Sequence, residues 1–200
     1  MQPLFPKSIE TIIATVAGLL ITSAQLILIR DVWRKKINPS LLTWLGWGLI
    51  MGTGLLAQIL EDGWQSSLTG LALSTAGCLC IFTIALLRNT FLYQRSDIKY
   101  LVLGLLCLII YISSHNAIIT TLFAILADFI AGIPTLIAGY RNPKSQKTIA
   151  WTLGAVSWAF TISVCFGHAW LYAWFPIYLF LYNLTLYIFT HRSTNAGKSI

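Results

Sequence analysis

The stretch "ILADFIAGIPTLIAGYRNP", residues 125–143, is an apolar run long enough to cross a bilayer, yet it contains a carboxylate and a proline. Asp128 lies near the middle of the apolar helix predicted here, and Pro134 follows six residues later. A charge is costly in hydrocarbon, and a proline removes a helix hydrogen bond. Together they predict a helix whose role goes beyond spanning the membrane.

The composition of the whole chain supports this membrane interpretation. The 200 residues are 57% hydrophobic and 10% charged, with a mean hydropathy of +0.77. Soluble domains average roughly 45–50% apolar and about 25% charged residues. Apolar runs long enough to span hydrocarbon recur along the chain. We predict an all-α polytopic membrane protein that forms a single membrane domain over residues 1–200. Its seven predicted spans are residues 9–29, 41–60, 67–87, 98–114, 117–140, 148–166 and 170–190.

The basic residues predict the orientation of these spans. With seven spans, twelve of the thirteen basic residues fall on one side and only Lys7 on the other. By the positive-inside rule the N-terminus lies outside and the C-terminus in the cytoplasm, and we expect a bacterial inner membrane. Models with six or eight spans scatter the charges over both faces. The twelve residues are Arg30, Arg34, Lys35, Lys36, Arg88, Arg95, Lys99, Arg141, Lys144, Lys147, Arg192 and Lys198.

The N-terminal apolar run and the tryptophans agree with this topology. The "TSA" before Gln25 also suits signal-peptide cleavage after Ala24, but the apolar run continues to Arg30 and favours a full span. Tryptophans are expected at the membrane interfaces. The inner set is Trp33, Trp44 and Trp151, and the outer set is Trp64, Trp170 and Trp174.

The two halves of the chain resemble each other. An offset of 107 residues pairs Arg34 with Arg141 and Trp44 with Trp151, and an offset of 110 pairs Ala14 with Ala124. We therefore predict a 3+1+3 parallel repeat, in which an odd linker helix lets both copies insert in the same orientation. The first repeat covers about residues 8–90, the linker helix about 97–115 and the second repeat about 117–192.

This layout, with a basic first loop and an early tryptophan in each repeat, resembles the SWEET/PQ-loop superfamily. The segment "ADFIAGIPTLIAGYRNPKSQKTIAW", residues 127–151, is similar to the second repeat of uncharacterised bacterial members. The resemblance covers about residues 8–191 and concerns layout more than motif. It implies small-solute transport by rocking of two bundles, although some members act as receptors or have no known transport role.

The chain departs from the family pattern at its named motifs. The Pro-Gln dipeptide appears as Ala24-Gln25 in one repeat and as Pro134-Thr135 in the other. SWEET-type proteins place an asparagine in the third helix of each repeat. Here Asn183 occupies one such place, and residues 76–79 contain none. Sugar specificity is therefore not carried over.

The helix around Asp128 has one small and polar face. Residues three, four and seven apart share a helix face, and the other faces here are rich in Ile, Leu and Phe. Asp128 lies about 16 Å from the outer end of its span at ~1.5 Å per residue. The face consists of Thr121, Ala124, Asp128, Gly132, Thr135 and Gly139.

We expect polar groups of several spans to converge near the midplane, where transporters of the repeat type bind substrate. Pro134 is expected to kink its helix, to free the Ile130 carbonyl and to act as a hinge. The candidate substrate-binding or proton-linked residues are Asp128, Thr135, Ser157, Asn183, Thr22 and Gln25.

The sequence supports two roles for Asp128. Apart from Lys99, at the inner end of the predicted span 98–114, no lysine or arginine lies within a predicted span. We therefore expect a carboxyl group that is neutral near pH 7 and exchanges a proton or meets a cationic solute. Alternatively, Asp128 bonds to Ser, Thr or Asn of a neighbouring span and only holds the bundle together. The first role predicts a small-solute transporter with alternating access. The second predicts a non-transporting scaffold or assembly factor, and a ligand-binding receptor of the same fold is a third alternative.

Other functions find little support. No paired carboxylates, phosphate loop, metal-ligand cluster or nucleophile with a base is present, so we expect no enzyme, cofactor or metal site. We expect Asp31 and Asp97 to be solvated ion-pair partners of nearby basic residues. The expected partners are membrane lipids and a small-molecule solute, with no nucleic acid, and homo-oligomers are left open.

The topology is tested by cysteine labelling from either side of the membrane. Because the basic residues share one side only if seven spans form, Ser66→Cys should react with an impermeant reagent from outside and Ser96→Cys only from inside. Reaction of both positions from the same side would contradict the seven-span topology.

Overall fold

The computed structural model describes residues 6–62, 69–114, 116–165 and 171–192, and it is helical throughout its regular elements. The all-α class is confirmed, and each helix end lies within four residues of a predicted span end. Two short 3₁₀ helices, η2 (Arg95–Asp97) and η3 (Pro143–Gln146), lie in loops. The α-helices are α1 (Lys7–Trp33), α2 (Leu41–Asp62), α3 (Thr69–Leu87), α4 (Ile98–Ser113), α5 (Ala117–Arg141), α6 (Ala150–Cys165) and α7 (Leu171–His191).

Three stretches among the described residues are long and apolar enough to cross a membrane: Lys7–Trp33, Thr121–Arg141 and Ala173–His191. The remaining helices have shorter apolar stretches. Large apolar side chains also point outward. Leu19 of α1 is 65% exposed and Leu87 of α3 is 75% exposed. In water such a surface is unfavourable, whereas lipid chains can cover it.

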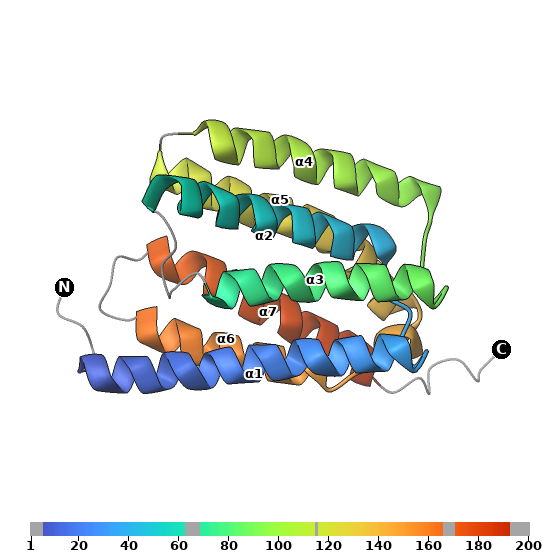
Figure 1. The fold of residues 1–200 in the computed structure, drawn as a ribbon. Coiled ribbons are helices and arrows are strands. Elements are labelled where there is room, and N and C mark those ends of the chain that lie inside the picture. The colour runs from blue at the N-terminus through green and yellow to red at the C-terminus, as the bar shows by residue number, and fades with distance from the viewer. Residues whose placement is uncertain (1–5, 63–68, 115, 166–170, 193–200) are drawn as a thin grey trace.

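The helices lie side by side in two rows with one helix at the edge (Figure 1). In the first row α3 packs against both α1 and α2, and in the second row α7 packs against both α5 and α6. Between the rows, α1 packs against α6 and α2 packs against α5. Helix α4 covers the edge formed by α5 and α2. Helix α1 begins at one end of the bundle, and α7 ends at the other (Figure 1).

Local hydrogen bonds define several helix ends. The Asn116 side chain accepts bonds from two backbone N–H groups of the first turn of α5, as an N-cap residue does. Lys35 and Asn89 have positive φ values of 56° and 49° after α1 and α3. In both places the N–H of the next residue donates to the carbonyl five positions earlier, from Lys36 to Asp31 and from Thr90 to Ala85. These are Schellman-type ends, so both helices stop for the same reason.

Aromatic side chains of three helices fill the space between the rows. Trp44 stacks on Trp151 with ring centroids 6.4 Å apart, and it meets Trp47 edge-on at 5.1 Å. Trp47 in turn packs edge-on against Tyr182 at 5.4 Å. This aromatic cluster (Trp44, Trp47, Trp151 and Tyr182) joins α2, α6 and α7. Aromatic contacts of this kind contribute about 0.5–1.5 kcal/mol each beyond the burial of area.

The interfacial depth predicted for the tryptophans stays a prediction, but two of them are buried inside the bundle. Trp44 and Trp151 are buried in the core, because each is the other's stacking partner. Trp33 is exposed and carries the Arg88 guanidinium over its ring at 5.0 Å. Trp174 is half-buried, and Trp64 and Trp170 lie outside the described residues.

Helix α5 runs without interruption through Pro134. Proline has no N–H, so the Ile130 carbonyl cannot receive the usual bond from position 134. Pro134 itself is buried, and its predicted role as a hinge stays a prediction.

The close approach of α5 to α7 is tested at Gly132. A Cβ at this position would lie 2.7 Å from Cε2 and the hydroxyl oxygen of Tyr182, whereas a Cβ at Gly18 of α1 meets nothing within 4 Å. Gly132→Ala should therefore lower the free energy of unfolding by about 1–3 kcal/mol through overpacking. Gly18→Ala, the matched control, should be neutral or stabilising by up to about 1 kcal/mol. Equal effects in thermal unfolding of the purified protein would contradict the α5–α7 contact.

Candidate functional site

Asp128 lies at the meeting point of three helices. Its side chain on α5 is only 2% exposed. The Tyr178 hydroxyl of α7 donates a 2.7 Å hydrogen bond to its carboxyl oxygen Oδ2. The Trp47 indole N–H of α2 donates a 3.0 Å bond to its backbone carbonyl. The buried carboxyl group is thus held from the second row by Tyr178, while Trp47 of the first row bonds to the backbone of the same residue.

Two tyrosines of α7 follow the small face of α5. Tyr178 and Tyr182 are four residues apart, as are Asp128 and Gly132, so the pairs meet on facing helix turns. The Tyr182 hydroxyl donates a 2.8 Å bond to the Gly132 carbonyl, and the glycine leaves room for the tyrosine ring. Sequence reasoning expected Ser, Thr or Asn as the partner of Asp128 and missed the tyrosines. The only sequence signal for them was that the two tyrosines have the same four-residue spacing as Asp128 and Gly132.

Thr135 extends the same face by two helix turns. Its side chain is fully buried, and its hydroxyl has no hydrogen-bond partner in the structure. Most buried polar groups are paired, because an unpaired one costs about 1–3 kcal/mol. The buried face of α5 therefore carries one carboxyl group with a neutral partner and one hydroxyl group with none.

The side chains of the other four candidate residues bond elsewhere in the bundle. Ser157 of α6 donates to the Ala17 carbonyl of α1 at 2.8 Å. Asn183 donates to the Leu179 carbonyl of its own helix at 2.8 Å and sits against Gly154 of α6.

Gln25 and Thr22 complete this set on α1. Gln25 reaches the Ser74 carbonyl of α3 at 3.4 Å, and Thr22 donates to the Gly18 carbonyl of its own helix at 2.8 Å. Within the described part of the chain, no hydrogen bond joins two of the six candidate side chains. Only Asp128 and Thr135 share one buried helix face.

The charges near Asp128 differ from those at the helix ends. In the described ranges, Asp31 forms ion pairs with Arg30 and Lys36, whereas no cation pairs with Asp128. The partner of Asp128 is a neutral hydroxyl group. The same ranges contain no group of three His, Cys, Asp or Glu side chains placed to share a metal ion.

Two of the hollows formed by the described residues are well defined, and Asp128 lines neither of them. One is an open groove of about 620 Å³ along the outer surface of α6 and α7. The other, of about 470 Å³, lies where the loop before α6 meets the end of α7. Asp128 is enclosed by side chains in this conformation.

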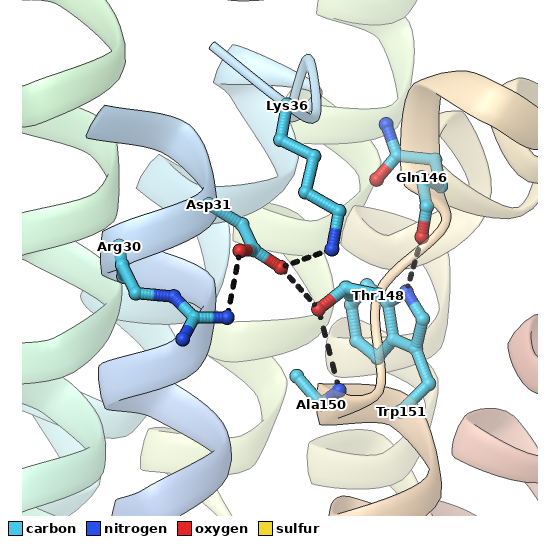
Figure 2. A network of polar contacts seen from close by, with 7 residues as sticks. All are labelled: Arg30, Asp31, Lys36, Gln146, Thr148, Ala150 and Trp151. Carbon is cyan, nitrogen blue, oxygen red and sulfur yellow. Dashed lines mark hydrogen bonds and ion pairs between the residues drawn. The ribbon is translucent and has the colours of Figure 1, made fainter. Parts of the chain in front are cut away.

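A second buried carboxylate lies at the end of α1, and sequence reasoning missed it (Figure 2). Asp31 was expected to be solvated, but it is only 1% exposed. It pairs with Arg30 at 3.2 Å and Lys36 at 3.5 Å, and it accepts a 2.7 Å bond from the Thr148 hydroxyl. The buried position is explained by Thr148, which is 117 residues away and was not a foreseeable partner. Asp97 is also buried, at 8% exposure, so the same expectation was wrong there.

The loops of the two halves join beside Asp31. The Asn38 N–H donates to the Ser145 carbonyl at 2.8 Å, and the Gln146 side chain donates back to the Asn38 carbonyl. The Gln146 carbonyl accepts the Trp151 indole N–H at 2.9 Å, and the Thr148 hydroxyl accepts the Ala150 N–H (Figure 2). This loop junction (residues 36–38 and 145–150) ties the end of α1 to the start of α6.

The contribution of the loop junction is tested at Thr148. Thr148→Val keeps the shape but removes the donor to the buried Asp31 carboxylate, and bonds to charged groups contribute about 1.5–3 kcal/mol. We expect a loss of that size in the free energy of unfolding, measured by chemical denaturation. Thr83→Val is the matched control, because the exposed Thr83 hydroxyl bonds only to the Leu79 carbonyl of its own helix. A loss no larger than that of the control would mean that the Thr148 bond contributes nothing.

Comparison with known proteins gives no assignment. The chain matches no protein-family model, no curated protein and no solved structure.

Proposed function

We propose that the chain is a seven-span membrane protein, built as a 3+1+3 parallel repeat, that moves a small solute by alternating access. Membrane insertion is supported by three helices that are long and apolar enough to span and by the large apolar side chains on the outer surface. The proposed place is a bacterial inner membrane, with the N-terminus outside. This orientation rests on the one-sided basic loops.

The repeat is supported by equivalent helix contacts. Helices α3 and α7 each lie between the two other helices of their row, and the contact of α1 with α6 mirrors that of α2 with α5. Residues that the 107-residue offset makes equivalent also meet, since Trp44 stacks on Trp151 and Asn38 bonds to Ser145. Helix α4 at the edge suits the linker. This arrangement agrees with the resemblance to the SWEET/PQ-loop superfamily.

The observation that carries a transport role is the environment of Asp128. An aspartate near the centre of a membrane helix costs about 2.5–3.5 kcal/mol on insertion scales. A hydrogen bond between membrane helices returns about 0.6 kcal/mol on average and at most about 1.7 kcal/mol. The bond from Tyr178 therefore does not offset the cost of the carboxyl group. A function that needs a carboxyl group explains why it is there.

The position of Asp128 suits a group that responds to rocking of the two halves. Tyr178 lies in the same half as Asp128, so their bond can persist during a rigid rotation. Trp47 lies in the other half, so separation of α2 from α5 breaks its bond to the Asp128 carbonyl and opens a path to the carboxyl group. The unpartnered hydroxyl of Thr135 is then free to bind solute. If the path to Asp128 opens first to one side of the membrane and then to the other, the protein carries a solute together with a proton, or a cationic solute alone.

The remaining candidate residues have supporting positions in this scheme. Ser157 and Gln25 lie at joints between helices, while Thr22 and Asn183 bond within their own helices. Pro134 lies one residue before Thr135, where a weakened helix bond would permit bending.

A second candidate function is a membrane scaffold or assembly factor. It is favoured by the tight enclosure of Asp128 and by the absence of Asp128 from the lining of both described hollows. In that case the bonds from Tyr178 and Trp47 only hold helices together. A ligand-binding receptor of the same fold is the third candidate, and it requires a solute that binds without being moved.

Uptake into reconstituted vesicles distinguishes these functions. A panel of neutral and cationic solutes is tested with and without an imposed pH difference, using wild type and Asp128→Asn. The amide keeps the shape but cannot ionise, so uptake driven by the pH difference or by cationic charge should fall at least a hundredfold while insertion and unfolding stay close to wild type.

Glu10→Gln is the control for this experiment, because it removes a carboxyl group near the beginning of α1. It should transport like wild type. Normal uptake by Asp128→Asn at every pH would contradict the transport role of Asp128. The scaffold would be supported if no variant takes up solute and if Asp128→Asn and Tyr178→Phe destabilise the protein equally.

A further inference from the structure

The groove along α6 and α7 adjoins the hollow at the loop junction. The two share Thr152 and Tyr187 in their linings, so they lie next to each other on this face. We name the two together the α6–α7 channel. Its long part is lined mainly by apolar side chains, among them Val156, Phe160 and Leu184. Its short part is lined by Lys36, Lys147 and His191.

The length of the apolar part matches one leaflet of a bilayer. It runs along α6 from Thr152 to Ser163, which is about 16 Å at ~1.5 Å per residue. Half of a hydrocarbon core of about 30 Å is roughly 15 Å. An acyl chain that enters at the basic end would therefore lie in the groove for the depth of its own leaflet.

The basic end carries an excess of positive charge. Lys36 shares the buried Asp31 carboxylate with Arg30, so two cations already face one anion (Figure 2). Lys147 is exposed and forms no ion pair within the described residues. It lines the hollow together with the Thr148 side chain and with His191. A group with a negative charge completes this set of donors.

We propose that the α6–α7 channel binds an anionic phospholipid of the cytoplasmic leaflet, with the phosphate at Lys147 and Lys36 and one acyl chain in the groove. This inference rests on the membrane placement in the proposed function and not on transport. Lipid chemistry fits both ends of the channel at once, since apolar side chains meet the chain and ammonium groups meet the phosphate.

A second copy of the protein fits this face less well. A two-fold dimer places the same patch on both subunits, so Lys36 and Lys147 of one copy would approach those of the other. Like charges brought together across an interface oppose association. The excess positive charge therefore favours a lipid over a dimer.

Binding is measured on the purified full chain in a non-ionic detergent, by counting bound lipids with native mass spectrometry. Dioleoyl phosphatidylglycerol carries one negative charge, and dioleoyl phosphatidylcholine has the same chains with no net charge. The anionic lipid should bind at least fivefold more tightly. Lys147→Ala should lower its affinity about fivefold, the usual effect of one lysine at an anionic surface. The affinity for phosphatidylcholine should not change.

Each end of the channel has one matched control variant. Lys144→Ala removes an exposed lysine from the same loop that does not line the hollow, and it should leave both affinities unchanged. Ala159→Trp fills the apolar groove and should weaken both lipids to the same extent. Ala76→Trp places the same bulk on an exposed position of α3 and should weaken neither. Water-soluble glycerol phosphate, which has the charge without chains, should not displace the bound lipid.

Several results would overturn the proposal. Equal affinity for the two lipids, or equal effects of Lys147→Ala and Lys144→Ala, would remove the head-group site. Displacement by glycerol phosphate would make it a simple anion site, and a dimer that Ala159→Trp dissociates would make it a protein interface. The binding assay does not depend on transport. If the lipid fails to bind while Asp128-dependent uptake is intact, only this inference is refuted. Specific lipid binding without any uptake refutes only the transporter.

Discussion

The hydrogen bond from Tyr178 to Asp128 is the interaction on which the centre of the bundle depends. It places a carboxyl group against a neutral donor, and no cation pairs with this group in the described part of the chain. The same alignment of α5 and α7 brings Tyr182 over Gly132 and positions the ring against which Trp47 packs. Through Trp47, the first row of helices is connected to the second at this level. The polar centre and the aromatic cluster are thus one assembly.

The loop junction provides a second connection between the rows, with a different chemistry. Asp31 is as buried as Asp128, but it faces two cations and a hydroxyl group. Such a carboxylate is held in place by several partners, and removing one of them leaves a buried charge poorly compensated. The bundle therefore has a charged tie at the end of α1 and a neutral polar contact at Asp128. In an alternating mechanism, the neutral contact is the one that is inexpensive to break and reform.

Much of the fold was predictable because the apolar runs report directly on helices. Long stretches such as residues 117–140 have one possible secondary structure if they cross a bilayer, and the observed α5 agrees with that prediction. The small face around Asp128 was also predictable from helical spacing, and Gly132 does pack closely against Tyr182. Local rules of period and residue size are enough for these features.

The partners of the polar residues could not be predicted in the same way. Which residue of α7 meets Asp128 depends on the rotation and depth of two helices, and a shift of one residue would turn Tyr178 away by about 100°. Asp31 looked solvated because its neighbours in sequence are basic, whereas Thr148 reaches it only through the folding of a distant loop. The stacking of Trp44 on Trp151 was not predictable either, because their depths give no information about which helix faces they occupy.

The central claim is that Asp128 changes its protonation or its partner when the protein works. Infrared difference spectroscopy of the reconstituted protein tests it most directly, through the carbonyl stretch of a protonated carboxyl group. The account predicts a band that is present at neutral pH without solute, shifts or disappears when a transported solute is added, and is absent in Asp128→Asn. A band that stays the same with every solute and at every pH, in a protein that still transports, would contradict it.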